Sequence, residues 1–93
     1  ATVVRSKTEG RAVLVTKGMA AAPTGKVYQA WLRDDTGHLS PAGVMPTGAD
    51  NTVVLQGDAT EATGVGITVE PAGGSKVPST SPIALFQFSE TKA

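Results

Sequence analysis

The chain has 93 residues, a size that fits one domain, and its eight basic and eight acidic residues leave no formal net charge. That balance excludes a strongly basic nucleic-acid surface and an acidic disordered tail as the basis of its function. Hydrophobic residues make up 40% of the chain, enough to bury a core, and only four residues are aromatic, so that core must be mostly aliphatic. The absence of cysteine excludes thiol nucleophiles, disulfides and cysteine-based metal sites.

The local pattern along the chain is typical of short β-strands. Valine outnumbers leucine eleven to five, and branching at Cβ favours extended backbone. Eleven glycines and six prolines interrupt the chain so often that no stretch of ten or more residues carries a helical apolar stripe free of both. Seven strands are predicted, in chain order at residues 2–7, 11–17, 26–33, 39–45, 52–56, 62–70 and 83–88.

These strands predict an all-β fold, either an antiparallel β-sandwich or a small barrel-like fold of about seven short strands. The connections are too short for the helical crossovers that parallel neighbours need. The Pro/Gly/Ser/Thr loop at residues 71–82 has the length of a Greek-key crossover between two sheets. The whole chain, 1–93, is expected to be a single domain cut from a longer protein, with a flexible tail at 89–93.

Two strands carry the most information about packing. In strand 62–70, Val65, Ile67 and Val69 alternate with smaller or polar residues, which predicts a half-buried strand with these three side chains in the core. Gly64 and Gly66 share the opposite face and leave a flat area where a large side chain can approach closely. In strand 11–17, Val13, Leu14 and Val15 place apolar side chains on both faces. This predicts that other parts of the protein cover both faces of the strand.

The strand at 26–33 places a large aromatic side chain on each face, Tyr28 on one and Trp31 on the other. This pattern favours a central strand that is covered on both sides. Trp31 is a suitable occupant for the flat area beside the two glycines. The alternative is a sugar-stacking platform made by the two aromatic rings, against which a core position is favoured.

The search for catalytic and metal-binding motifs yields no candidate residues. His38 is the only histidine, and no G-x-S-x-G elbow marks a serine nucleophile. Asp34, Asp35 and His38 lie close in sequence, but adjacent carboxylates on one turn rarely converge on a metal, so a solvated turn with an Asx-type hydrogen bond is favoured. Gly64-Val65-Gly66 lacks the third glycine and the helix of a dinucleotide-binding loop. No catalytic residue, cofactor or metal ligand is therefore predicted.

Two segments form a motif when they are taken together. The first is Tyr28-Gln29-Ala30-Trp31-Leu32, and the second is a strand end followed by two glycines and a serine. Proline ends the second strand because it cannot donate to a ladder, and paired glycines allow backbone angles that other residues avoid. Glu70, the carboxylate before Pro71, either accepts hydrogen bonds from the loop that follows the strand or is solvated. Both interpretations stay open. The motif residues are Tyr28, Gln29, Trp31, Leu32, Glu70, Pro71, Gly73, Gly74 and Ser75.

These segments, in this order and spacing, resemble the C-terminal extracytoplasmic domain of the anti-sigma-K factor family, over essentially the whole chain. The resemblance implies a bacterial single-span membrane protein whose cytoplasmic domain holds an extracytoplasmic-function sigma factor inactive. It also implies that a site-1-type protease cuts outside the membrane before a second cut within it, which releases the sigma factor. The chain would be the outer, non-enzymatic regulatory domain, on the extracytoplasmic side of the cell membrane.

Several partners are accordingly not expected for this segment itself. The sigma factor would bind a cytoplasmic domain that the segment lacks, and nucleic acid is not expected because the basic residues do not cluster. Direct membrane insertion is not expected because no apolar run approaches the ~20 residues of a spanning helix. The alternative function is a generic extracellular binding or adhesion module with an immunoglobulin-like sandwich. The sequence does not determine the oligomeric state.

Overall fold

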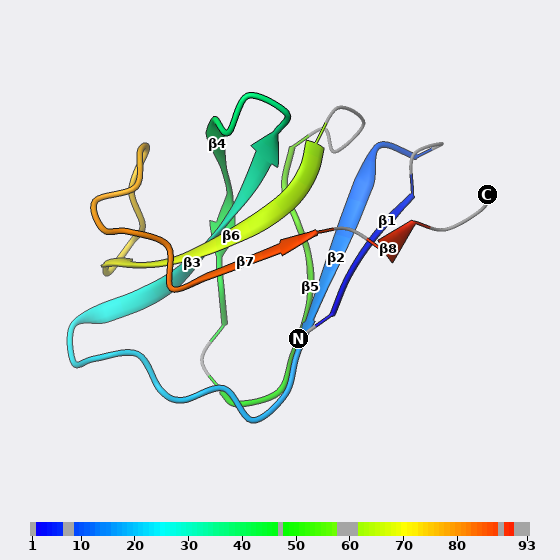
Figure 1. The fold of residues 1–93 in the computed structure, drawn as a ribbon. Helices are drawn as coiled ribbons and strands as arrows, with labels where there is room; N and C mark the ends of the chain where they lie inside the picture. The colour runs from blue at the N-terminus through cyan, green and yellow to red at the C-terminus, as the bar shows by residue number, and fades with distance from the viewer. Residues whose placement is uncertain (1, 7–8, 47, 58–61, 88, 91–93) are drawn as a thin grey trace.

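The computed structural model describes residues 2–6, 9–46, 48–57, 62–87 and 89–90. These residues form eight strands and no helix, and Figure 1 shows them as two layers. The strands are β1 (Thr2–Ser6), β2 (Arg11–Thr16), β3 (Lys26–Asp34), β4 (Leu39–Val44), β5 (Asn51–Val54), β6 (Ala62–Pro71), β7 (Ala84–Gln87) and β8 (Ser89–Glu90).

The strands pair into two sheets that face each other across one core. The first sheet has the order β5-β2-β1-β8, and the second has the order β4-β3-β6-β7. All neighbouring pairs are antiparallel except β1 and β8, which run parallel. With β4 beside β3 and β5 beside β2, the order is that of an immunoglobulin-like sandwich. The predicted all-β sandwich is therefore confirmed.

The loop before β7 does not make the crossover that its length suggested. It joins β6 to β7, which are antiparallel neighbours in the same sheet. The chain instead changes sheets between β2 and β3, between β4 and β5, between β5 and β6, and between β7 and β8. The length of a loop does not determine which strand the next strand pairs with. Here, side chains of the second sheet bind the loop, as described below.

The short strand β8 is an element that the sequence pattern does not predict. Its two residues pair in parallel with Val4 and Arg5 of β1. No helical crossover is needed for this parallel pair, because the two strands come from opposite ends of the chain and the whole sandwich lies between them. Phe88 and Lys7, the predicted last residues of two strands, lie outside the described part of the chain, as do residues 58–61 and 91–93.

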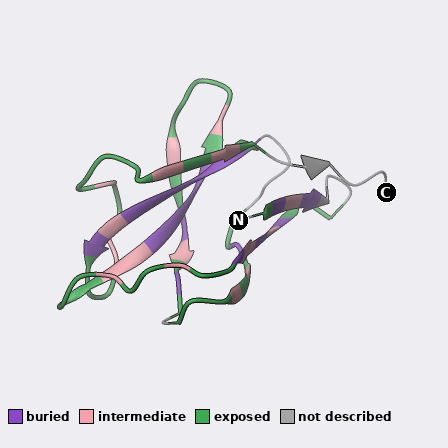
Figure 2. Ribbon diagram, turned by 60° about the horizontal axis from the view of Figure 1, so that its bottom comes forward, coloured by how far each residue is buried: buried purple, intermediate pink, exposed green. Residues whose placement is uncertain are grey.

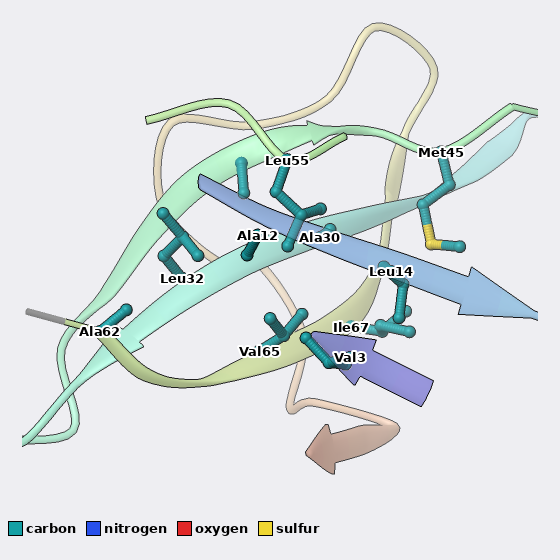
Figure 3. Packing of buried hydrophobic residues seen from close by; sticks show 11 residues of the cluster. Val3, Ala12, Leu14, Ala30, Leu32, Met45, Leu55, Ala62, Val65 and Ile67 are labelled. Atoms are coloured by element: carbon teal, nitrogen blue, oxygen red, sulfur yellow. The ribbon is translucent and has the colours of Figure 1, made fainter. Parts of the chain in front are cut away.

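The core is aliphatic, as the composition requires, and lies between the two sheets (Figures 2 and 3). Val65 and Ile67 of β6 are 0% and 1% exposed, so the predicted core face of that strand is confirmed for these two residues. Val69, the third member of the face, is half-buried. The cluster consists of Val3, Ala12, Leu14, Ala30, Leu32, Ala42, Met45, Leu55, Ala62, Val65 and Ile67.

Strand β2 is covered on one face only. Leu14 is fully buried in the core, whereas Val13 and Val15 on the opposite face are half-buried. Val13 pairs across the sheet with Val54, which is 64% exposed, so the outer face of this sheet is open there. The predicted cover on both faces of this strand is wrong, because the described residues place no layer on that side of the first sheet.

Strand β4 tolerates its internal proline because it lies at the edge of the second sheet. Its pairing with β3 shifts register between Ala30 and Trp31, next to Pro41, which pairs with Trp31. The chain beyond β5 then links the sheets at this side, since Leu55 N–H donates to Ala12 O and Gln56 N–H donates to Ala42 O. The β4–β5 side of the sandwich is therefore joined by backbone hydrogen bonds.

Candidate functional site

The two motif segments lie side by side, because β3 and β6 are antiparallel neighbours at the centre of the second sheet. Their register places Val27 opposite Glu70 and Trp31 opposite Gly66. Side chains alternate across a strand, so Gln29 and Trp31 of β3 face the same way as Glu70 of β6. This is the outer face of the sheet, away from the aliphatic core, and yet all three of these side chains are buried.

Trp31 is 0% exposed and pairs with Gly66 across the β3–β6 ladder. That its ring fills the flat area beside the two glycines stays a prediction. A Cβ at Gly66 would lie 3.2 Å from Cδ2 of Leu85 and 3.6 Å from Cδ2 of Leu39, so neighbouring side chains already fill this space. Because the indole is covered, the alternative of an exposed sugar-stacking platform is wrong for this structure.

A chain of side-chain hydrogen bonds runs from Trp31 to Glu70. Trp31 Nε1 donates to Thr68 Oγ1 over 2.7 Å, and Thr68 Oγ1 donates to Glu70 Oε2 over 2.5 Å. The Thr68 hydroxyl thus accepts one bond and donates the next, which aligns the dipoles toward the carboxylate. Both Thr68 and Glu70 are 0% exposed.

We call the segment between β6 and β7, residues 72–82, the strap. It is bound to side chains of this outer face at two points, and the Thr80 hydroxyl also donates to the backbone Val69 O over 2.9 Å. At the first point, Gln29 Nε2 donates to Ser75 O over 2.9 Å and Ser75 N–H donates to Gln29 Oε1 over 2.7 Å. At the second, Ser79 donates from its hydroxyl and its backbone N–H to the Glu70 carboxylate. Of the two interpretations of Glu70, acceptance of hydrogen bonds from the following loop is confirmed.

The donors around Glu70 determine its charge state. Burial alone raises the pKa of this carboxyl. The hydroxyls of Ser79, Thr68 and Ser75 and the backbone N–H of Ser79 lower it by more than burial raises it, so that the pKa is about 2. Hydrogen bonds to the charged form therefore outweigh desolvation, and Glu70 is a buried carboxylate at neutral pH. A carboxylate with so low a pKa is a weak general base, so the arrangement is suited to holding the strap rather than to proton transfer.

The other motif residues have different positions. Tyr28 packs against the aliphatic core and Leu32 belongs to it, so both face away from the strap. Pro71 is the last residue of β6. Gly74 has a φ of +83° and a Cβ there would lie 2.8 Å from Val44 Cγ2 and 2.9 Å from Gln29 Oε1, so this glycine is needed both for its backbone angle and for close contact. Gly73 is exposed, also with positive φ.

Sequence reasoning missed two members of this hydrogen-bonded group. Thr68 shares the face of Glu70 by period-two alternation, so its position could have been found from the strand pattern. Ser79 is nine residues from Glu70 in an irregular loop, and no local pattern indicates that contact.

The turn between β3 and β4 has the predicted Asx-type hydrogen bonds. Asp34 Oδ1 accepts from the backbone N–H groups of Thr36 and His38, each over 2.9 Å, and from the Thr36 hydroxyl over 2.6 Å. The Thr36 hydroxyl is the largest influence that lowers the pKa of Asp34. Within the described ranges, no three His, Cys, Asp or Glu residues gather in a way that could hold a metal ion. The same residues contain no helix long and apolar enough to cross a membrane.

Fold and site together define a β-sandwich whose buried polar residues bind a loop to the sheet. Comparison with known proteins identifies the family of this chain. The family model described as "Anti-sigma-K factor rskA, C-terminal" matches residues 1–83. The chain belongs to this family of anti-sigma factor C-terminal domains, as its motif segments suggested.

Curated relatives include proteins named as anti-sigma-K factors. A Streptomyces griseus protein named "Uncharacterized protein in phr 5'region" is 50% identical over 88 residues, which cover 94% of this chain and 37% of that protein. "Anti-sigma-K factor RskA" of Mycobacterium sp. (strain KMS) is 42% identical over 84 residues, 88% of this chain and 34% of the relative. The protein of the same name from Mycolicibacterium vanbaalenii is 39% identical over 82 residues, 86% of this chain and 34% of the relative. The chain thus spans about a third of the length of these relatives, and no solved structure matches it significantly.

Proposed function

We propose that this chain is the extracytoplasmic regulatory domain of a membrane-anchored anti-sigma factor, and that its folded state restrains release of an extracytoplasmic-function sigma factor by regulated proteolysis. The observation that carries the proposal is the family match over residues 1–83, supported by relatives named as anti-sigma-K factors.

The partners in this proposal act on the parent protein. The sigma factor binds a cytoplasmic domain outside this segment, and a site-1-type protease makes the first cut on the outer side of the membrane. Relatives almost three times as long as the matched segment leave room for both a sigma-binding domain and a membrane span. The proposal assigns this domain no nucleic acid, cofactor or metal.

The physical basis of the restraint is the conformation that a protease needs. A protease binds its substrate as an accessible extended segment that can leave its neighbours, and a chain paired in a packed sheet does not offer one until it opens. Here β1 pairs with β2 on one side and with β8 on the other. Loss of sheet packing should therefore raise cleavage of the parent even without an inducing signal.

The experiment places Ile67→Ala in the full-length parent. Ile67 is 1% exposed in the core, and the change should destabilise the domain by ~2–5 kcal/mol. The matched control is Val54→Ala, which also shortens an aliphatic side chain on a strand but at a position 64% exposed. Intact parent and sigma-dependent transcription are measured in cells, and the unfolding free energy is measured on the purified domain.

We expect less intact parent and more sigma-dependent transcription for Ile67→Ala, and values near wild type for Val54→Ala. A stable, full-length Ile67→Ala parent with unchanged transcription, despite a measured loss of domain stability, would show that folding of this domain does not control release.

A generic extracellular binding or adhesion module is the second candidate, because the immunoglobulin-like strand order is common among such modules. The complete gene product distinguishes the two. A single membrane span and a cytoplasmic helical domain upstream support the regulatory domain, whereas a signal peptide or tandem sandwich repeats support the adhesion module.

A further inference from the structure

The strap differs from the rest of the fold in how it is held. Most of its residues are exposed, Val77 by 70%, and only Gly74, Ser75 and Pro78 are half-buried. It therefore buries little apolar surface of its own. Its attachment consists mainly of hydrogen bonds to two buried side chains of the sheet, Gln29 and Glu70, with one further bond from the Thr80 hydroxyl to Val69 O.

The strap can leave without breaking the sandwich. The pairing of β6 with β3 runs through Pro71, and the pairing of β6 with β7 begins at the pair Ile67 and Ala84. The strap connects these two paired regions and belongs to neither. None of its residues is a member of the aliphatic core cluster. Segments with few apolar contacts and exposed hydrogen bonds open at a lower free energy than the whole domain.

The two attachment points flank one exposed basic residue. Ser75 binds Gln29 and Ser79 binds Glu70, and the peptide bond between Lys76 and Val77 lies between them. Exposed loops with small and polar residues are preferred sites of proteolytic cleavage, but the bond must first adopt an extended conformation away from the sheet. The hydrogen bonds at both ends resist that movement.

We propose that the strap opens as a unit while the sandwich stays folded, and that this opening controls the access of an endoprotease to residues 75–79. The chemical step is hydrolysis, in which one water molecule adds across the bond between Lys76 and Val77, leaving a carboxylate on Lys76 and an amine on Val77. A cut there separates β7 and β8 from the rest of the chain, so each sheet keeps one of its strands only by non-covalent pairing. The inference about strap opening stands without the proposed function, but its biological meaning, an entry point for the regulatory protease, rests on it.

The test is limited digestion of the purified 93-residue chain with trypsin, with fragments identified by mass. Cleavage after Lys76 reports strap opening. Cleavage after Lys17, an exposed residue in the connection from β2 to β3, is an internal control at a bond that the strap does not contact. The test variant is Ser79→Ala, which removes the hydroxyl donor to Glu70. The matched control is Ser81→Ala, an exposed strap serine for which the described part of the chain offers no hydrogen-bond partner.

We expect Ser79→Ala to raise the cleavage rate after Lys76 about tenfold, since a hydrogen bond to a charged group is lost and the rate follows the open population. The rate after Lys17 and the behaviour of Ser81→Ala should stay at wild-type values. The single tryptophan gives a second readout, because Trp31 is linked to the strap through Thr68 and Glu70. Its fluorescence should become easier to quench with acrylamide in Ser79→Ala at temperatures where circular dichroism still shows the native sheet.

Two results would overturn the inference. An unchanged rate after Lys76 in Ser79→Ala would show that these hydrogen bonds do not hold the strap. An equal rise after Lys17 and Lys76 would show that the strap opens only when the whole domain unfolds. Neither result bears on the restraint proposed above, which is tested by core variants of the parent in cells.

Discussion

At the scale of single residues, Trp31 shows how a strand with an aromatic side chain on each face is accommodated. The ring belongs to a residue that pairs with Gly66, which carries no side chain, and Thr68 accepts its only polar hydrogen. The ring is thereby buried with its N–H group hydrogen-bonded, although it lies outside the aliphatic cluster.

Trp31→Ala should accordingly destabilise the domain by ~3–5 kcal/mol, because it leaves a large cavity on the outer face of the sheet. Urea or thermal unfolding of the purified chain measures the change. Val54→Ala, at a largely exposed position, provides the comparison. A Trp31→Ala protein that melts within about 2 °C of wild type would contradict the buried position.

Glu70 makes stability depend on pH. Its pKa is about 2 in the folded protein and near 4.5 in the unfolded chain, so the carboxylate contributes its full stabilisation above about pH 4.5. This contribution is lost progressively as the pH falls from about 4.5 to about 2, because protonation then becomes favourable in the unfolded chain first. The glutamine side chain in Glu70→Gln does not titrate, so the stability of this variant does not fall through protonation at this position.

We therefore expect Glu70→Gln to be less stable than wild type at pH 7, and the difference between the two unfolding free energies to shrink toward pH 2. Asp35→Asn, at an exposed carboxylate in the turn between β3 and β4, serves as the control for general acid effects. Two stability curves that stay parallel from pH 7 to pH 2 would show that Glu70 is not the titrating group.

At the scale of strands, the sequence predicts the position of elements better than their pairing. Seven of the eight strands lie within about two residues of their predicted bounds, because valine-rich alternation and Gly/Pro punctuation are local signals. The partner of each strand is a property of the whole fold. The crossover between sheets that was predicted for the loop at 71–82 is therefore wrong. Strand β8 has only two paired residues and shows no recognisable sequence pattern.

The candidate site shows the same division. Gln29, Glu70 and the glycine-serine segment could be selected from the sequence because two motifs with fixed spacing contain them. That Gln29 binds Ser75 could not be derived, because 46 residues separate them and only the β3–β6 register brings them together. Ser79 was missed for the same reason.

The pairing of β6 with β7 depends on a glycine with no space for a side chain. A Cβ at Gly64 would lie 2.2 Å from the carbonyl oxygen of Phe86, a backbone atom that cannot move away alone. Gly64→Ala should force β7 away from β6 and destabilise the domain by about 3 kcal/mol. Gly66→Ala is the matched control, because its nearest neighbour is the flexible end of Leu85 at 3.2 Å, and its effect in urea unfolding should be clearly smaller. Equal effects of the two changes would contradict the close approach at Gly64.

At the scale of the whole molecule, the protein is a small sandwich with two kinds of stabilisation. An aliphatic cluster holds the two sheets together, and a few polar side chains hold the strap on the outer face of one of them. The core variants and the strap variants should therefore act differently, the first on unfolding of the domain and the second on local opening.

We propose above that the stability of this domain restrains sigma factor release. The most direct measurement is sigma-dependent transcription in cells carrying full-length parents with graded core changes, plotted against the unfolding free energy of each purified domain. The series consists of wild type, Val54→Ala, Ile67→Val, Val65→Ala and Ile67→Ala, with expected losses from near zero to ~2–5 kcal/mol. The account predicts that transcription rises steadily as domain stability falls. Transcription that stays constant across the series, while the measured stabilities differ as expected, would contradict it.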